Sequence, residues 1–442
     1  MKTPICDFAK AYAAASPVRL HTPGHKGQGF LGFEALDITE LAGADDLYCP
    51  TGIIRESEEN ASALFGCPTV YSTEGSSQCI RAMVYLAMLW AKSHGKTPRI
   101  AAGRNAHRTF LSAVSLLDTE VQWLYPSEET GYLSCNITAE QLESLFESDL
   151  PPTAVYVTSP DYLGQLADIH SLSEVCHRHG ALLLVDGAHG AYLRFLPESR
   201  FFTDLGADLC CSSGHKTLPV LTGGAYLHIS QALYTLSHQV KPAMALFGST
   251  SPSYLILQSL DAANGYLANC KEAFGEFSRH VEELKKLLTD RGYQLIGTEP
   301  WKVTIAAKAR GYGGEEMAEY LEKKGIVCEF CDPDYLVLML TPQIGEAGLS
   351  KLKEAFVALP QKPPVTTAPP PIKKAVRVCS PRTASLAPSR QVPVEESLGK
   401  VLADPGIGCP PAVPILVCGE QIDAHAIDCF RYYGIEKVSV TD

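Results

Sequence analysis

Short apolar runs alternate with helical patterns through residues 61–290 of the chain. Between most of these runs the apolar positions recur with helical spacing, as in 77–93, 138–147 and 171–179. Strands that alternate with helices predict a mostly parallel sheet covered on both faces, as in doubly wound α/β folds. The seven predicted strands are Thr69–Ser72, Arg99–Ala102, Val121–Leu124, Thr153–Thr158, Ala181–Asp186, Asp208–Ser212 and Gly224–His228.

The pattern changes near the end of this region and beyond it. A loop without a helix separates the last two strands, and this favours an antiparallel pair because a parallel return needs a crossover. A helical stretch over 253–291 leads to a smaller α+β pattern, and prolines then mark a stiff linker. The predicted divisions are an irregular N-terminal segment (1–60), a large domain (61–290), a small α+β domain (291–359), a linker (360–375) and a C-terminal unit (376–442).

Within the small domain the pattern predicts three strands and two helices. These are strands at 302–307, 327–330 and 336–340, with helices at 314–324 and 346–358.

Composition excludes several classes of protein. The 442 residues are 46% hydrophobic and carry a net charge of −12, which argues against a nucleic-acid partner because such proteins usually have a basic face. We expect no signal peptide, and the sequence has no apolar run long enough to span a bilayer. The 15 cysteines lack the spacing of a zinc site, so we expect no metal, and we expect reduced thiols in the cytoplasm.

Two charged residues follow predicted strands. Lys216 comes just after the run 208–212, and Asp186 ends the run ALLLVD. The carboxyl ends of such strands are where α/β proteins bind ligands. A lysine there can act as a nucleophilic amine, and a buried carboxylate can face a cation such as a pyridinium nitrogen. A surface lysine and a turn-forming aspartate are the ordinary alternatives.

Two further segments also begin at strand ends. Gly75, Ser76 and Ser77 open a helix, whose N-terminus can hold a phosphate, although a simple serine cap would look the same. His107, after the second strand, could stack on an aromatic ring or merely be solvated. These segments together offer an amine, a carboxylate, an anion cradle and a flat ring, and this set suits pyridoxal 5'-phosphate (PLP). A nucleotide fits less well, because the sequence has no dinucleotide or P-loop fingerprint.

The ordered motifs of the chain resemble the ornithine/lysine/arginine decarboxylase family of fold-type I PLP enzymes. This likeness implies an aspartate-aminotransferase-like large domain. Because the first motif begins at residue 21, we expect a short form without the family's N-terminal wing domain. The motifs are HTPGHKG (21–27), ADDLYCPTG (44–52), GSS (75–77), RNAHRT (104–109), TSPDYLGQLADI (158–169), DGAHG (186–190), SSGHK (212–216), STSPSYLILQSLDAA (249–263) and CPPAVPILVCGE (409–420).

The resemblance implies roles for individual residues. Lys216 would be the Schiff-base lysine, Asp186 would pair with the pyridine nitrogen, and His107 would stack on the ring. With His215, which could also move a proton, these form the expected catalytic set. The resemblance further implies a homodimer with the active site at the interface. The remaining cofactor-binding residues would be Gly75, Ser76, Ser77, Ala188, Ser213 and His215, with Thr250 or Ser251 reaching the neighbouring subunit's phosphate.

The implied reaction is decarboxylation of arginine, lysine or ornithine to an amine and CO2. Two alternatives stay open: another fold-type I reaction such as transamination or elimination, and a PLP-binding regulator without catalysis. Glu74, Arg108 and Gly187 depart from the family pattern and put the substrate's identity in doubt. Glu420 and the pair Asp45–Asp46 are candidate carboxylates for the substrate's basic group.

Overall fold

The computed structural model describes residues 1–126, 131–406, 408–409 and 413–441. Its contacts divide the chain into two compact units, residues 1–96 with 182–275 and residues 97–181 with 276–442. Each of the seven predicted strands is found, and they form one mixed sheet in the order β1-β7-β6-β5-β4-β2-β3. The strands are β1 (Thr69–Ser72), β2 (Arg99–Gly103), β3 (Glu120–Leu124), β4 (Ala154–Thr158), β5 (Leu182–Asp186), β6 (Leu209–Ser212) and β7 (Ala225–Ile229).

Strand directions follow the connections. β5 and β6 are parallel neighbours, and Asp186 is in register with Cys211. β7 runs antiparallel to β6 and to β1, as the short connection from β6 to β7 predicts. Every residue of β5 and β6 is buried. Buried parallel strands are continuous apolar runs, and this is why the sequence locates them well.

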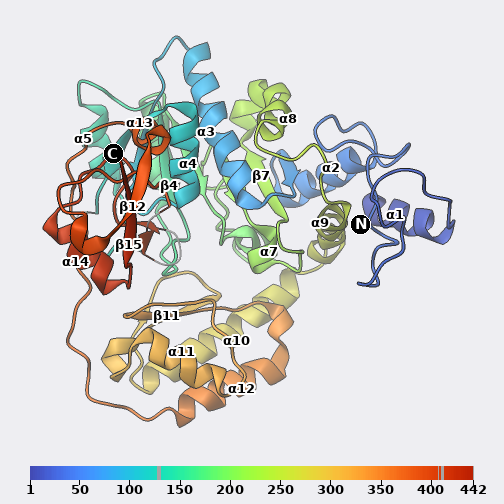
Figure 1. Ribbon diagram of the computed structural model, residues 1–442. Coiled ribbons are helices and arrows are strands. Elements are labelled where there is room, and N and C mark those ends of the chain that lie inside the picture. The colour runs from blue at the N-terminus through green and yellow to red at the C-terminus, as the bar shows by residue number, and fades with distance from the viewer. Residues whose placement is uncertain (127–130, 407, 410–412, 442) are drawn as a thin grey trace. The chain divides into compact units, whose positions relative to one another are not determined.

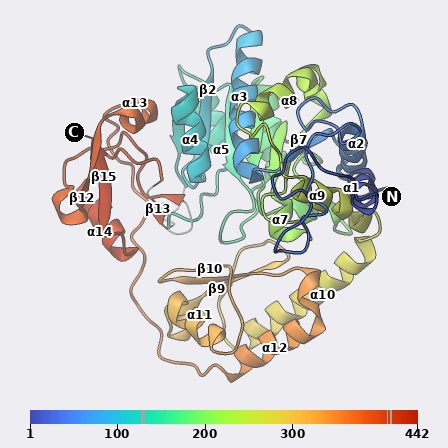
Figure 2. The same cartoon turned by 45° about the vertical axis from the view of Figure 1, so that its right-hand side comes forward.

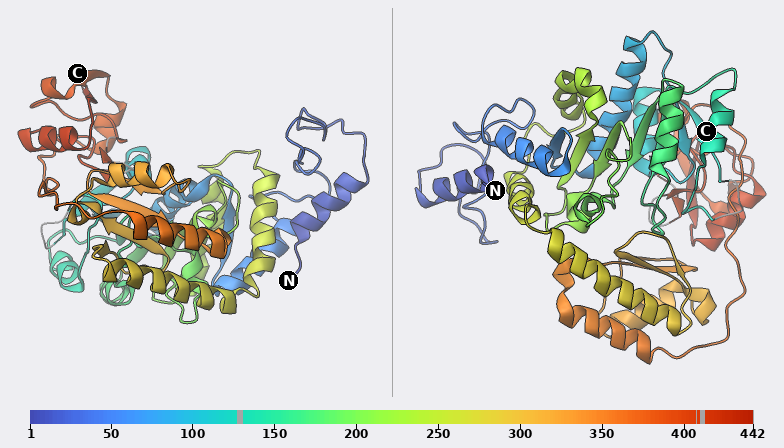
Figure 3. Two further views of the ribbon diagram at one scale, coloured as in Figure 1. Left: turned by 90° about the horizontal axis from the view of Figure 1, so that it is seen from below. Right: turned by 180° about the vertical axis from the view of Figure 1, so that it is seen from behind.

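The first unit contains helices that the sequence does not predict. Residues 1–60 are not irregular throughout, because α1 (Pro4–Ala14) occupies the N-terminus and α2 (Ile53–Phe65) begins within the segment. Pro4 lies in the first turn of α1, where its missing N–H is not needed. The two helices pack with α9 (Tyr254–Leu267), as Figures 1 and 3 show. The unit's other helices are α3 (Gly75–Ser93), α7 (Gly214–Thr217) and α8 (Ser237–Ala245).

The predicted helical stretch 253–291 is two helices. α9 ends at Leu267, and three residues separate it from α10 (Lys271–Asp290). A four-stranded antiparallel sheet follows, and α10, α11 and α12 cover one of its faces (Figures 1 and 3). The short strand β8 is not predicted, and β10 begins later than predicted. The elements are β8 (Leu295–Ile296), β9 (Lys302–Ala306), α11 (Gly314–Glu322), β10 (Phe330–Cys331), β11 (Tyr335–Met339) and α12 (Gly345–Ala358).

The second unit also contains the C-terminal residues. No helix or strand occurs within 360–376. Beyond this stretch, β12 and β15 lie side by side as an antiparallel pair (Figure 2). Their core, with Leu402, Ile415 and Phe430, is shared with Tyr132 and Leu133. The unit's remaining elements are α4 (Arg108–Leu117), α5 (Ala139–Phe146), α6 (Ile169–Arg178), α13 (Pro381–Leu386), β12 (Ser389–Pro393), β13 (Gly408–Cys409), β14 (Val413–Pro414), α14 (Ala424–Tyr432) and β15 (Lys437–Thr441).

No helix among the described residues is long and apolar enough to cross a bilayer.

Candidate active site

Lys216 lies on a single helical turn directly after the buried strand β6. The turn, α7, is held by the main-chain N–H of His215, which donates to the carbonyl oxygen of Gly224 at 3.1 Å, and the side chain of His215 contacts the same oxygen at 3.0 Å. Lys216 is half-buried, and its Nζ is hydrogen-bonded to Nε2 of His189 at 2.8 Å. The lysine is therefore fixed at the carboxyl end of a sheet strand, as predicted.

Asp186 ends the neighbouring strand β5 and is buried. One of its carboxylate oxygens, Oδ1, accepts a hydrogen bond from the main-chain N–H of Ala188 at 3.2 Å and lies 3.6 Å from Sγ of Cys211. Burial, reinforced by Asp186, raises the pKa of the Cys211 thiol well above its ordinary value. Cys211 therefore stays a thiol and can donate to the carboxylate. Parallel neighbours end at one edge of the sheet, so β5 and β6 bring Asp186 and Lys216 to the same edge.

The predicted anion cradle is assembled at the same side. Gly75, with φ of +70°, opens α3, and its N–H donates to the carbonyl oxygen of Gly223 at 2.7 Å. The hydroxyls of Ser76 and Ser213 are 2.6 Å apart. The first N–H groups of a helix have no partner within the helix and favour an anion. The structure thus joins α3 and the loop after β6 around one helix N-terminus, and Ser77 lies in the same first turn.

A Cβ on Gly75 would make only an ordinary contact with the His215 ring, at 4.0 Å, so the positive φ and not a lack of space is what favours glycine here. Ser72 shapes the turn before the helix, because its hydroxyl donates to Gln78 at 2.6 Å and accepts from the N–H of Glu74 at 3.1 Å. Glu74, one of the departures from the family pattern, is itself exposed.

His107, the predicted stacking residue, belongs to the other unit. It caps α4, where its Nδ1 accepts from the N–H of Thr109 at 3.2 Å. A neutral ring that accepts at Nδ1 carries its proton on Nε2. Its contact with a cofactor stays a prediction. Thr250 and Ser251 are exposed in the loop between α8 and α9, where Ser251 donates its N–H to Ser249, and their role in a partner's site also stays a prediction.

The candidate carboxylates for the substrate's basic group are occupied within the chain. Asp45 accepts from the N–H groups of Thr51, Gly52 and Ile54 and so caps α2. Glu420 is buried and accepts from the N–H of Val417 at 2.7 Å. Asp46 accepts from the N–H groups of Tyr48 and Cys49. These carboxylates therefore organise the chain locally. Residues 410–412 of the C-terminal motif lie outside the described residues.

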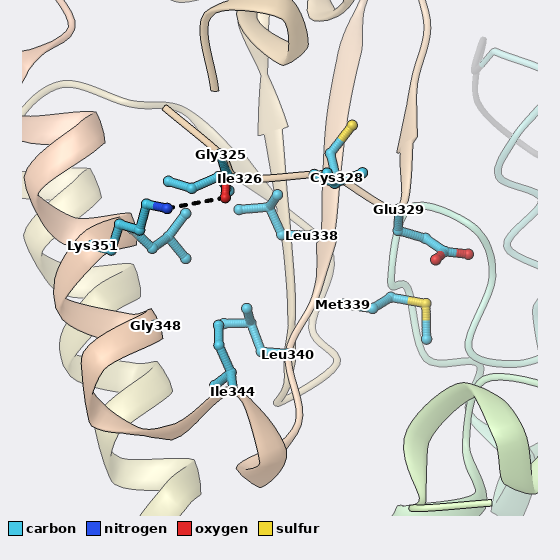
Figure 4. A pocket seen from close by; sticks show the side chains of 12 residues that line it. Gly325, Ile326, Cys328, Glu329, Leu338, Met339, Leu340, Ile344, Gly348 and Lys351 are labelled. Carbon is cyan, nitrogen blue, oxygen red and sulfur yellow. Dashed lines mark hydrogen bonds between the residues drawn. The ribbon is translucent and has the colours of Figure 1, made fainter. Parts of the chain in front are cut away.

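A cavity of about 330 Å³ lies in the small α+β region, and none of the predicted site residues lines it (Figure 4). Leu338, Leu340 and Ile344 line it, and Lys351 donates to the carbonyl oxygen of Gly325 at 3.2 Å. Among the described residues there is no group of three histidine, cysteine or acidic side chains placed to hold a metal ion.

Sequence reasoning missed His189. The residue stands in the quoted DGAHG motif, three positions after Asp186, but a histidine in a short turn that also contains two glycines looks like a solvated residue. The structure buries it and places it against Lys216.

The donor set fits PLP. A helix N-terminus with hydroxyls suits its phosphate, a buried carboxylate suits its ring nitrogen, and a fixed amine suits its aldehyde. A mixed seven-stranded sheet that offers these groups at its strand ends is typical of fold-type I PLP enzymes. Residues 3–294 match the family described as Orn/Lys/Arg decarboxylase, major domain, and the chain belongs to this family of PLP-dependent amino-acid decarboxylases.

Curated relatives extend along the whole chain. An arginine decarboxylase of Halalkalibacterium halodurans is 29% identical over 95% of this chain and 91% of its own length. An arginine decarboxylase of Bacillus subtilis is 29% identical over 96% of this chain and 92% of its own. The fold resembles that of the Francisella novicida lysine decarboxylase LdcF, with a TM-score of 0.77 at 16% identity, over 100% of this chain and 81% of that one. The expected family, fold class and enzyme class are thus confirmed.

Proposed function

We propose that the protein removes the α-carboxyl group of arginine, lysine or ornithine as CO2 and releases the corresponding amine. The observation that carries this proposal is the placement of Lys216 and Asp186 at the ends of adjacent parallel strands. When bound there, PLP withdraws electrons from the substrate's Cα.

The chain's own residues divide the remaining work. Lys216 holds the cofactor by its amine, and the α3 N-terminus with Ser76 and Ser213 binds the phosphate. Asp186 keeps a proton on the ring nitrogen, because its buried carboxylate favours a cation beside it. His215, held against Gly224, is positioned beside the cradle. Ala188 supports the turn by its bond to Asp186.

Arginine is the first substrate to test, because two of the relatives that match nearly the whole chain are named arginine decarboxylases. An identity of 29% does not distinguish among the basic groups of arginine, lysine and ornithine, so all three are assayed. Because the family's active site lies at a dimer interface, we propose a homodimer in which Thr250 or Ser251 reaches the partner subunit's phosphate site.

The test is a comparison of the full-length wild type with Lys216→Ala, and with Lys271→Ala as a matched control on an exposed lysine. CO2 release from arginine, lysine, ornithine and glutamate is measured beside keto-acid formation and the cofactor's absorbance. Lys216→Ala should lose turnover and the absorbance band, whereas Lys271→Ala should keep both.

Keto acid without CO2 would instead identify a transaminase. Tight PLP binding with no turnover of any of the amino acids would identify a regulator without catalysis. Normal turnover by Lys216→Ala would refute the proposed role of the lysine.

A further inference from the structure

Main-chain hydrogen bonds hold the turn that carries His189. Its turn closes on itself, since the N–H of Gly190 donates to the carbonyl oxygen of Gly187 at 2.8 Å. The turn is also joined to β6, because Gly187 donates to the carbonyl oxygen of Cys211 at 3.0 Å and Ser213 donates to that of Ala188 at 3.2 Å. The imidazole and the lysine therefore lie on two segments that are hydrogen-bonded to each other.

We propose that His189 is the proton partner of Lys216: it takes the proton of the lysine ammonium through Nε2 and so frees the amine to react with the cofactor's aldehyde. This inference rests on the lysine and cofactor of the proposed function. The separation of 2.8 Å lies within the range for direct proton transfer. Imidazole also gains and loses protons near neutral pH more readily than other side chains.

The step balances in atoms and charge. The ammonium proton of Lys216 passes to the imidazole of His189. The neutral amine would then be free to condense with the cofactor's aldehyde, whose oxygen would leave as water with the two amine hydrogens. When the lysine is released again, His189 returns the proton.

A second buried histidine shows what a purely structural role looks like. His228 lies on β7, which is separated from β5 by β6, and its two ring nitrogens contact the hydroxyls of Thr69 at 2.9 Å and Ser212 at 2.7 Å. Burial lowers its pKa to about 3, so it stays neutral. His189 differs because its partner is an amine, with which it can exchange a proton.

The experiment follows capture of PLP by the full-length chain after removal of the cofactor, by the rise of the cofactor's absorbance band. We compare the wild type, His189→Ala, and His228→Ala as the matched control for loss of a buried imidazole. His189→Ala should slow capture by about a hundredfold, which is the ordinary contribution of a general acid–base group. Imidazole added to the buffer should restore the rate in proportion to its concentration, whereas capture by His228→Ala should be near the wild-type rate and insensitive to imidazole.

Circular dichroism checks that each variant is folded. If His189→Ala does not fold, His189→Asn takes its place in the comparison. His189→Asn keeps a hydrogen-bonding side chain but cannot carry a proton, so it should also be slow. The inference would be overturned if the His189 variants captured PLP at the wild-type rate. It would also be overturned if His189→Ala captured PLP slowly and added imidazole did not raise the rate. Because capture needs no substrate, these results are separate from CO2 release: a chain that captures PLP with imidazole rescue but decarboxylates nothing would refute the proposed function alone.

Discussion

Arg104 joins the loop after β2 to the C-terminal motif through a buried ion pair. Its guanidinium donates to the carbonyl oxygens of Pro414 at 2.8 Å and Ile415 at 2.9 Å, and lies 3.4 Å from Glu420. The side chains of Arg104 and Glu420 are 1% and 6% exposed. Because Arg104 directly precedes the segment that leads to His107, this pair fixes the C-terminal residues to the predicted stacking loop.

Replacement of Arg104 by Met should cost about 3–5 kcal/mol of unfolding free energy, since it leaves the Glu420 charge buried without a partner. Glu420→Gln should cost less, about 2 kcal/mol, because the amide oxygen can still accept from the N–H of Val417. The double variant should lose less than the sum of the two, by about 1–3 kcal/mol, because neither charge then remains uncompensated.

Urea unfolding followed by tryptophan fluorescence measures these losses, and Trp123 is a local reporter because its ring lies 5.5 Å from the guanidinium carbon of Arg104. Arg431→Met is the matched control, because Arg431 pairs with Glu395 on the surface, where both side chains are more than half exposed. This control should change the stability by less than about 0.5 kcal/mol. Equal losses in the two arginine variants, or strict additivity in the double variant, would refute the argument.

Three further predictions concern buried groups. Burial raises the pKa of Asp332 to about 6. Between pH 3.8 and 6 the folded chain therefore binds more protons than the unfolded chain, and its stability falls as pH rises. In urea unfolding, Asp332→Asn should stabilise the protein by up to about 3 kcal/mol at pH 7 and by almost nothing at pH 3.5. Burial lowers the pKa of His228 to about 3, so between pH 3 and 6.5 the unfolded chain binds more protons than the folded chain, and stability falls as pH falls. At pH 5 the wild type should lose about 2 kcal/mol of unfolding free energy that His228→Gln does not lose. Equal dependence of stability on pH in the two proteins would contradict this. Gly187→Ala should cost about 1–3 kcal/mol because its Cβ would overlap the Phe202 ring, and a thermal melt should show part of the loss regained when Phe202→Leu is added.

The sheet could be predicted because its strands carry their signal locally. LLLVD in β5 and LCCS in β6 are buried along their whole length, so each is a continuous apolar run. The N-terminal helices were hidden by the prolines and glycines of 17–29. The C-terminal pair β12–β15 joins residues nearly fifty positions apart, and a pairing at that distance leaves no local pattern.

Some residues of the candidate site could likewise be predicted from local sequence, and others could not. Lys216 and Asp186 could be predicted because each directly follows a recognisable strand. His189 could not, since its orientation depends on the register that sets Asp186 opposite Cys211. The ion pair of Glu420 with Arg104 could not be predicted either, because the two residues are 316 positions apart in the chain.

Gly187 illustrates how a departure from a family pattern can arise from packing rather than from chemistry. Phe202 is buried beside the turn, and its ring fills the space that any side chain at 187 would enter. The turn nevertheless keeps the bond from Ala188 to Asp186 and the contact of His189 with Lys216. A glycine at 187 and a phenylalanine at 202 are therefore one joint solution to packing this turn. Any larger residue at 187 would require the Phe202 ring to move.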